Sequence, residues 1–154
     1  MTEEIIGTLQ GVSRHTYDNI FNLYFTRERV IAYITQSPDD VPPSFYWWNF
    51  LISSWFDKHR ETRQRMKINR ERISSLKELS VAELVSAHPS NFDIRFSNIT
   101  FIDINRRMLE YRLYFHLTTP VAGRLVIDFI LKKEQVILAR DLLQKILSSK
   151  FKRP

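Results

Sequence analysis

The sequence predicts an α+β fold, in which a bent antiparallel sheet of six or seven strands is capped by a C-terminal helix and interrupted by a helical insertion. Short segments rich in β-branched and aromatic residues form two groups, at 4–34 and 98–131. Residues 44–88 and 132–149 instead carry apolar side chains at helical spacing. With 154 residues, 44% of them hydrophobic, the chain is predicted to form one domain, 1–154, with its own core.

The first group of strands begins with Glu4–Val12, which is followed by a predicted turn at 14–19. Ile20–Phe25 and Val30–Ile34 are short and rich in strand-forming residues, and the polar residues between them predict a tight hairpin. The proline-rich stretch 36–43, QSPDDVPP, then ends this group.

The predicted helical insertion covers residues 37–88. It contains Phe45–Phe56, FYWWNFLISSWF, in which seven of the twelve residues are aromatic. Apolar residues in this block recur every three or four positions, which predicts a helix with a very wide apolar face. Further along, Ser80 and Glu83 have the spacing of a capping box, so a short helix is predicted from there through Ala87.

Three further strands are predicted at Asn98–Ile104, Glu110–Thr118 and Arg124–Leu131. The stretches 105–107 and 120–123 between them predict the turns of an antiparallel meander. The final segment, 132–149, is predicted to be an amphipathic helix whose apolar stripe consists of Val136, Ala139, Leu143, Ile146 and Leu147.

Two stretches resemble motifs of a known superfold. Leu23–Ile31, LYFTRERVI, is similar to a hairpin motif of GRAM-like and prokaryotic pleckstrin-homology-like domains. Asn91–Ile99, NFDIRFSNI, is similar to the stretch that leads into the second sheet of those domains. With the order of the elements, these motifs make residues 4–35 and 76–149 resemble the pleckstrin-homology (PH)-like superfold. The resemblance implies a partly open barrel that acts as a non-catalytic binding module.

The chain departs from that superfold in two respects. The insertion at 37–75 lies outside the resemblance. The inositide-binding pattern of the family, a Lys in the first strand with Lys/Arg-x-Arg on the second, is not reproduced. Its nearest match is Arg14 with Arg27 and Arg29, and these arginines are predicted to lie in turns.

The aromatic block runs directly into Lys58–Arg72, which contains seven Lys/Arg and two Glu. Such an aromatic–basic pair suits the edge of an anionic bilayer. For the aromatic block, core packing, an oligomer or partner interface and membrane contact all stay open. The basic segment is either a solvated helix face or a ligand surface. The candidate partner- or membrane-binding residues are Trp47, Trp48, Phe50, Trp55, Lys58, Arg60, Arg63, Arg65, Lys67 and Arg70.

These features predict a binding or assembly module that mediates protein–protein contact or self-association, with an anionic phospholipid surface as a further partner. The formal net charge of +6 favours anionic partners in general. The alternative function is a nucleic-acid-binding regulator, which would use Arg60, Arg63, Arg65, Lys67 and Arg70 for phosphate contacts.

The residue types offer no convergent set for catalysis or metal binding. The chain has no cysteine, its four histidines stand apart, and its three glycines form no phosphate-cradling loop. Nothing in the sequence pairs Asp103 with Asp128, and both are predicted to be solvent-facing strand residues. We therefore expect no enzyme activity, cofactor, metal or small-molecule substrate. No secretory signal heads the sequence and no apolar run reaches the roughly 18–20 residues of a membrane span, which predicts a cytoplasmic location, peripheral to a membrane at most.

Overall fold

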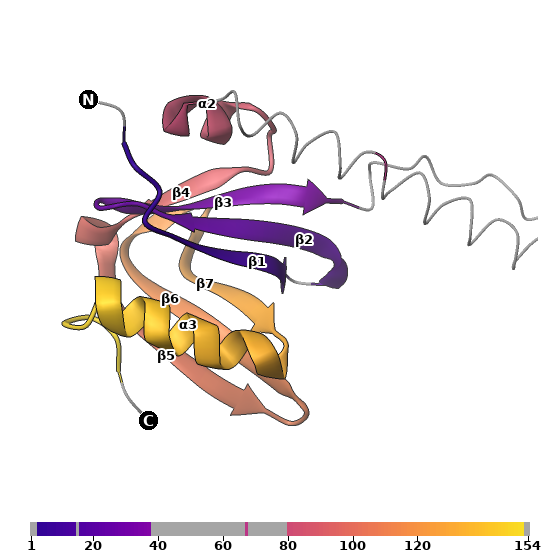
Figure 1. Cartoon of the computed structure of the whole chain (residues 1–154), viewed down its shortest axis with the longest axis vertical. Coiled ribbons are helices and arrows are strands. Elements are labelled where there is room, and N and C mark those ends of the chain that lie inside the picture. The colour runs from indigo at the N-terminus through magenta and orange to yellow at the C-terminus, as the bar shows by residue number, and fades with distance from the viewer. Residues whose placement is uncertain (1–2, 15, 38–66, 68–79, 153–154) are drawn as a thin grey trace, which may run out of the picture.

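The computed structural model describes residues 3–14, 16–37, 67 and 80–152. Its architecture is α+β: one seven-stranded antiparallel sheet in the order β4-β3-β2-β1-β7-β6-β5, with a helix near the C-terminus (Figure 1). The predicted antiparallel sheet and C-terminal helix are confirmed. The elements are β1 (Gly7–Arg14), β2 (Thr16–Phe25), β3 (Arg29–Gln36), α2 (Val81–Ser86), β4 (Phe92–Arg95), the 3-10 turn η2 (Phe96–Asn98), β5 (Ile99–Arg107), β6 (Glu110–Val121), β7 (Arg124–Leu131) and α3 (Lys133–Ile146).

The hairpin of β1 and β2 contains a bulge at Gly11. Gly11 has a φ of 66°, and its backbone N–H donates to Asn22 Oδ1 at 3.0 Å. The pairing register shifts between Leu9 and Val12, as expected where one extra residue is inserted opposite the partner strand. The predicted turn at 14–19 is wrong. β2 begins at Thr16. The sequence did not indicate this start, because the first residues of the strand are mostly polar and show no apolar alternation.

The meander of β5, β6 and β7 has the predicted connectivity; its first turn lies later in the chain than the predicted 105–107, and its second lies within the predicted 120–123. β5 continues to Arg107, and the two-residue turn is Met108–Leu109. β6 continues to Val121, and its turn is Ala122–Gly123, with φ of 49° and 73°. Two left-handed residues in a row match the twist of the flanking strands, which favours this tight hairpin.

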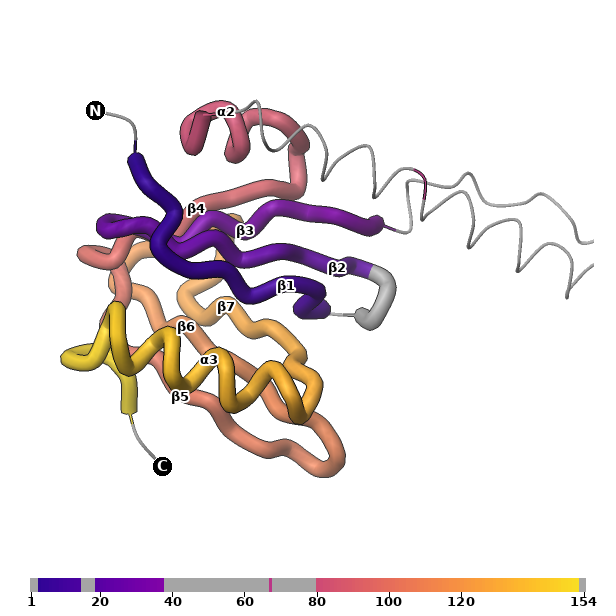
Figure 2. Tube along the Cα trace, viewed as in Figure 1, coloured from indigo at the N-terminus to yellow at the C-terminus, as the bar shows by residue number. Residues whose placement is uncertain are grey.

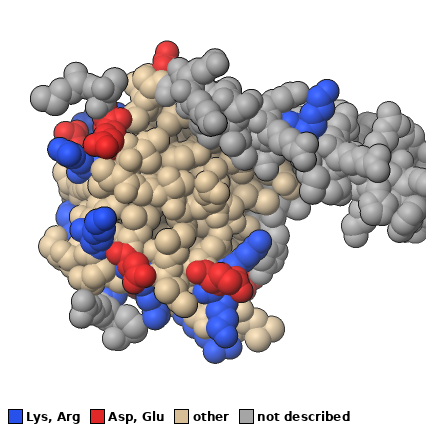
Figure 3. All heavy atoms as spheres, viewed as in Figure 1, with Lys and Arg blue, Asp and Glu red and all other residues tan. Residues whose placement is uncertain are grey.

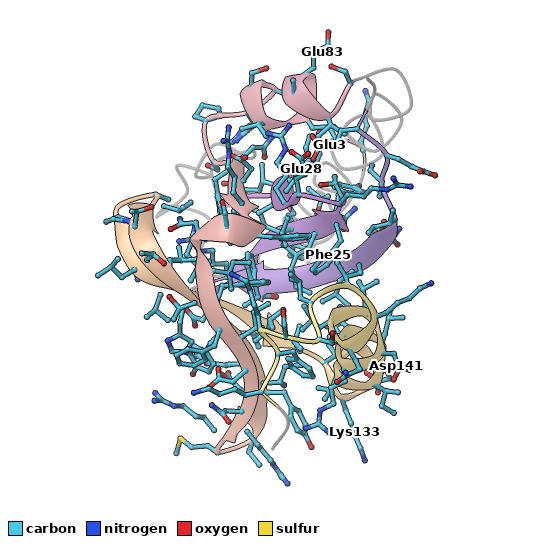
Figure 4. The ribbon with its side chains drawn as sticks, turned by 90° about the vertical axis from the view of Figure 1, so that its left-hand side faces the viewer. Glu3, Phe25, Glu28, Glu83, Lys133 and Asp141 are labelled. Atoms are coloured by element: carbon cyan, nitrogen blue, oxygen red, sulfur yellow. The ribbon has the colours of Figure 1, made fainter. Side chains whose placement is uncertain are left out.

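The two halves of the sheet share one hydrophobic core. β1 and β7 pair at a single position, Ser13 opposite Ile130, so the sheet bends sharply there. The core cluster lies inside this bend, and Phe25 points into it in Figure 4. One side is closed by α3 and the segment after it, through buried Val136, Ala139, Leu143, Leu147 and Phe151. All of these except Phe151 belong to the predicted apolar stripe. Ile146, the remaining residue of that stripe, is half-buried.

The short helix α2 begins as the capping box predicted. Ser80 Oγ accepts from the Glu83 backbone N–H, and the Glu83 carboxylate accepts from the Ser80 N–H at 2.7 Å. Figure 2 shows how the chain passes from α2 through β4 back alongside β3. Of the predicted insertion 37–88, only 37, 67 and 80–88 are described. The aromatic block and nine of the ten candidate binding residues therefore lie outside the described residues.

Candidate anion-binding pocket

A partly open pocket of about 240 Å³ lies where several connections of the sheet converge. Its walls come from the end of β1, the first half of β2, the end of β3, the segment leading into β4, and the turn between β6 and β7. The lining residues are Arg14, Asn19, Phe21, Ile34, Pro89, Ser90, Asn91, Phe92 and Ala122. The walls thus combine apolar rings with polar groups at one rim.

Arg14, the last residue of β1, is the charged residue among those that line this pocket. Only 8% of its surface is exposed, and its Nε has no hydrogen-bond partner. Its guanidinium carbon lies 4.8 Å from the centroid of the Phe92 ring, which gives the cation an aromatic face to rest on. The ring face replaces water only in part. It attracts the cation, but it accepts no strong hydrogen bond from the Nε–H group.

The Gly11 bulge explains why Arg14 faces inward. Strict alternation from buried Leu9 would direct Gly11 and Ser13 to the core. The bulge shifts this phase by one residue, so Val12 and Arg14 are the buried positions instead. An arginine that plain alternation would leave in solvent is therefore turned toward the interior.

The electrostatic surroundings of Arg14 favour an anion. Burial is the largest influence and lowers the pKa of the guanidinium, and the nearby charge of Arg124 lowers this pKa further. Asp128 acts in the opposite direction. Arginine stays protonated at neutral pH despite such a shift. The pocket therefore holds a desolvated positive charge with a second cation near it, and an incoming anion would relieve both the desolvation and the unmet hydrogen bond.

Asn91 holds the segment before β4, which forms one wall of the pocket, against β3. Its side chain is buried, Oδ1 accepts from the Ile34 backbone N–H at 2.8 Å, and Nδ2 donates to the Leu84 carbonyl at 2.7 Å. Both ends of the amide are thus engaged in joining β3 to α2. The geometry leaves the guanidinium of Arg14 as the principal group that can bind a ligand in the pocket.

The three arginines of the nearest inositide-like match do not converge. Arg29 opens β3 and Arg14 ends β1, so the prediction that both lie in turns is wrong; Arg27 does lie in the turn. Arg29 is bound by Glu3 and Asp93 at the β2–β3 turn, at the far end of the β1–β2 hairpin from Arg14. Arg27 is largely exposed, with Glu4 at 3.9 Å. Among the predicted binding residues, Lys67 is helical and exposed.

A second polar group lies on the outer face of β5, β6 and β7. The ring of His116 stacks on Phe101 at 3.9 Å between centroids, and its Nε2 faces Asp103 Oδ1 at 3.6 Å, too far for a hydrogen bond. Asp128 accepts from Arg112 at 2.7 Å. Asp103 and Asp128 are both mostly shielded and have polar neighbours, so the prediction that they face solvent is wrong. Cross-strand register, which the sequence alone does not specify, brings these residues together.

Within the described ranges, no group of three or more His, Cys, Asp or Glu side chains is arranged to hold a metal ion. The same part of the chain contains no helix long and apolar enough to cross a membrane. Comparison with family models, curated proteins and solved structures gave no match.

Proposed function

We propose that this protein is a non-catalytic, PH-like binding or assembly module that recognises an anionic group of its partner. The observation that carries the proposal is Arg14, a nearly buried guanidinium whose Nε has no acceptor and which lines a partly open pocket. A buried, unpaired charge costs stability, so its presence at the wall of a hollow favours a binding role.

The size of the pocket limits the ligand. Its volume of about 240 Å³ lies below the range of roughly 300–1,000 Å³ that is usual for sites of drug-sized molecules. A carboxylate with a few attached carbons fits between Phe21, Ile34 and Phe92 better than a bulky headgroup does. An acidic side chain or a terminal carboxylate of a protein partner is the ligand class that these dimensions favour.

The aromatic–basic segment 45–72 extends the same proposal. Its seven Lys/Arg in 58–72 favour an anionic partner, and its aromatic residues favour an interface with a protein, with a second copy of this chain or with anionic phospholipid. Ile34 and Pro89 line the pocket and lie shortly before and after this segment in the sequence. The proposal includes no enzyme activity, cofactor or small-molecule substrate, and a cytoplasmic, peripheral location stays a prediction.

A nucleic-acid-binding regulator is the second candidate, and one feature of the sheet favours it. Phe101, His116 and Tyr114 form a row of rings on the outer face, with Lys152 Nζ 3.8 Å from the Phe101 ring centroid. Rings beside cations suit single-stranded nucleic acid. Asp103 and Asp128 lie on the same face and would repel phosphates, so this candidate ranks below the first.

The experiment that tests the first proposal follows the Arg14 side chain by NMR. The full ¹⁵N-labelled chain is titrated with sodium acetate and then with inorganic phosphate at constant ionic strength. We expect a saturable shift of the Arg14 Nε–Hε resonance. Arg14→Met should abolish the saturable response, whereas Arg27→Gln, which changes an exposed arginine, should preserve it.

The same Arg14→Met variant gives a stability readout. Replacement of the unpaired charge by an apolar side chain of similar length should raise the free energy of unfolding by about 1 kcal/mol, because the desolvation cost disappears. Acetate should raise the melting temperature of the wild type more than that of the variant. A linear, non-saturable shift in the wild type, or an acetate effect that is equal in the two proteins, would refute the anion-binding role.

A further inference from the structure

The turn between β5 and β6 exposes two large apolar side chains. Met108 is 94% exposed and Leu109 is 89% exposed, whereas the next most exposed large hydrophobic residue among those described, Ile137, reaches 69%. Met108 also has a φ of 52°, a conformation that glycine or asparagine adopts more readily. Neither core packing nor turn chemistry accounts for a methionine at this position, so its exposure points to a contact outside the chain.

Cations surround this apolar tip. Arg106 and Arg107 precede it, and Lys132 and Lys133 open α3 nearby. Figure 4 places Lys133 at the same end of the molecule as the β5–β6 turn, and Figure 3 shows basic side chains, with acidic ones among them, in this region. The guanidinium of Arg106 lies 5.8 Å from the Tyr111 ring centroid, which holds this cation beside the tip.

A hollow of about 420 Å³ separates the tip from the start of α3. Its lining includes Arg106, Leu109, Lys132 and Lys133, so cations and an exposed leucine share one wall. Glu110 also lines it, but its carboxylate is paired with Arg112 at 3.0 Å. Glu134, in the first turn of α3, is the other acidic residue close in sequence to these lysines. Three cations therefore line the hollow against one acidic residue, which is itself paired.

We infer that the β5–β6 turn is a membrane-docking tip for anionic phospholipid. Met108 and Leu109 enter the boundary between headgroups and acyl chains, while Arg106, Arg107, Lys132 and Lys133 bind the headgroup phosphates. A pair of apolar side chains at the end of a hairpin inserts between lipids without a complementary groove, which a protein partner would have to supply. The inference goes beyond the proposed function, because it involves neither Arg14 nor the segment 45–72.

The test uses the absence of cysteine in the native chain. A single cysteine replaces either Met108 or Leu125 and is labelled with an environment-sensitive fluorophore in the full-length protein. Leu125 is the matched control, because it is also an exposed apolar residue but lies next to the β6–β7 turn, at the other end of β6. Vesicles consist of phosphatidylcholine alone or with phosphatidylserine.

We expect the Met108→Cys label to brighten, to shift to shorter wavelength with phosphatidylserine vesicles, and to be quenched by spin-labelled lipid, while the Leu125→Cys label stays unchanged. The unlabelled variant Met108→Ser/Leu109→Ser should reduce vesicle partitioning roughly tenfold, and Arg106→Gln/Arg107→Gln by a similar factor. Because all four side chains are exposed, these variants should fold like the wild type.

The inference would be overturned by a Met108→Cys label that stays in water while the protein is bound to vesicles. Equal partitioning of the wild type and the tip variants would overturn it as well, and so would a label shift that needs no vesicles and follows protein concentration. Vesicle binding that is lost in Arg14→Met and unchanged in the tip variants would overturn the inference and leave the proposed function intact. Absence of any vesicle binding would also overturn it, whereas the acetate titration tests the pocket separately.

Discussion

Arg14 and Arg29 are two arginines of the same sheet in opposite electrostatic conditions. Arg29 donates to Glu3 through Nε and Nη2 and to Asp93 at 3.1 Å, and this ion network raises its pKa. Arg14 has a ring face and no acceptor at Nε. The Arg29 network stabilises the β2–β3 turn. Figure 4 labels Glu3 of this network and Glu28 of the turn, which lie close together. The difference between the two arginines lies in the acceptors around them: Glu3 and Asp93 at Arg29, none at Arg14 Nε.

The Arg29 network leads to a prediction about Glu3. Hydrogen bonds from Arg29, followed by a smaller contribution from Thr26, lower the pKa of this carboxyl below its ordinary value of 4.5, against the effect of burial. Glu3→Gln should reduce the free energy of unfolding by about 1 kcal/mol at neutral pH. A depressed carboxyl pKa stabilises the fold above the unfolded-state value, so the difference should vanish as the pH falls through the lower, folded-state value.

Urea unfolding at neutral pH and at a pH below that of the folded-state pKa measures both quantities. Glu4→Gln is the matched control, because Glu4 is 73% exposed and lies 3.9 Å from Arg27, which is 79% exposed. It should change stability little at either pH. Equal effects of the two substitutions at neutral pH would contradict the assigned role of Glu3.

At the scale of elements, α2 depends on its neighbours. A helix of six residues is too short to persist by itself in water. Val81 and Leu84 pack against Tyr24, Ile31 and Tyr33 on the outer face of β2 and β3, and Asn91 bonds to the carbonyl of Leu84. The capping box starts the helix, and the tertiary contacts keep it folded.

Asn91→Ala should therefore destabilise both α2 and the pocket wall. The substitution leaves the Ile34 N–H and the Leu84 carbonyl without their partner, which should cost about 2 kcal/mol. Amide exchange in 81–86 should accelerate more than exchange in β6, as hydrogen–deuterium exchange would measure. Ser90→Ala, next to it and exposed, is the control and should leave both rates unchanged. Uniform acceleration across the sheet would mean that α2 does not open separately.

At the scale of the whole molecule, two half-sheets are held together by a shared core more than by backbone pairing. Between β1 and β7, only Ser13 and Ile130 pair, while the rings of Phe21, Phe92 and Phe129 meet across the interior. The segment after α3 adds to this closure, because Ile102 donates to the Lys150 carbonyl and accepts from the Lys152 N–H. The described core thus joins both half-sheets, α3 and the segment after it.

Self-association through the aromatic block is the prediction at this scale. All three tryptophans, Trp47, Trp48 and Trp55, lie in this block, so the tryptophan fluorescence reports on it alone. With rising protein concentration, the sedimentation coefficient should increase and the tryptophan emission should move to shorter wavelength together. Trp48→Ser/Trp55→Ser should remove both changes, and Leu125→Ser should retain them. A monomer with short-wavelength emission at every concentration would show instead that the block packs in a core.

Local patterns predicted much of the fold. The bounds of β7, the buried residues Val136, Ala139 and Leu143 of α3 and the capping box at Ser80 follow from apolar period and side-chain chemistry alone. The Met108 turn was missed because the turn contains no glycine or proline. The Arg14 pocket was missed because an arginine beside a predicted turn has no local mark of burial. Glycine at position 11 inside a strand pattern was the one available signal, since it indicates a bulge.

The sequence by itself determined the kind, order and apolar face of most described elements, because these depend on neighbours within a few positions of each residue; the short strand β4 was not among the strands predicted. Only the tertiary structure decided which polar groups face the interior and which meet across strands. Arg14 lies over Phe92, which is far from it in the sequence, and Asp103 faces His116 through the pairing register of β5 and β6. The cost of burying a charge depends on the acceptors around it in space, and folding alone brings those acceptors near or keeps them away.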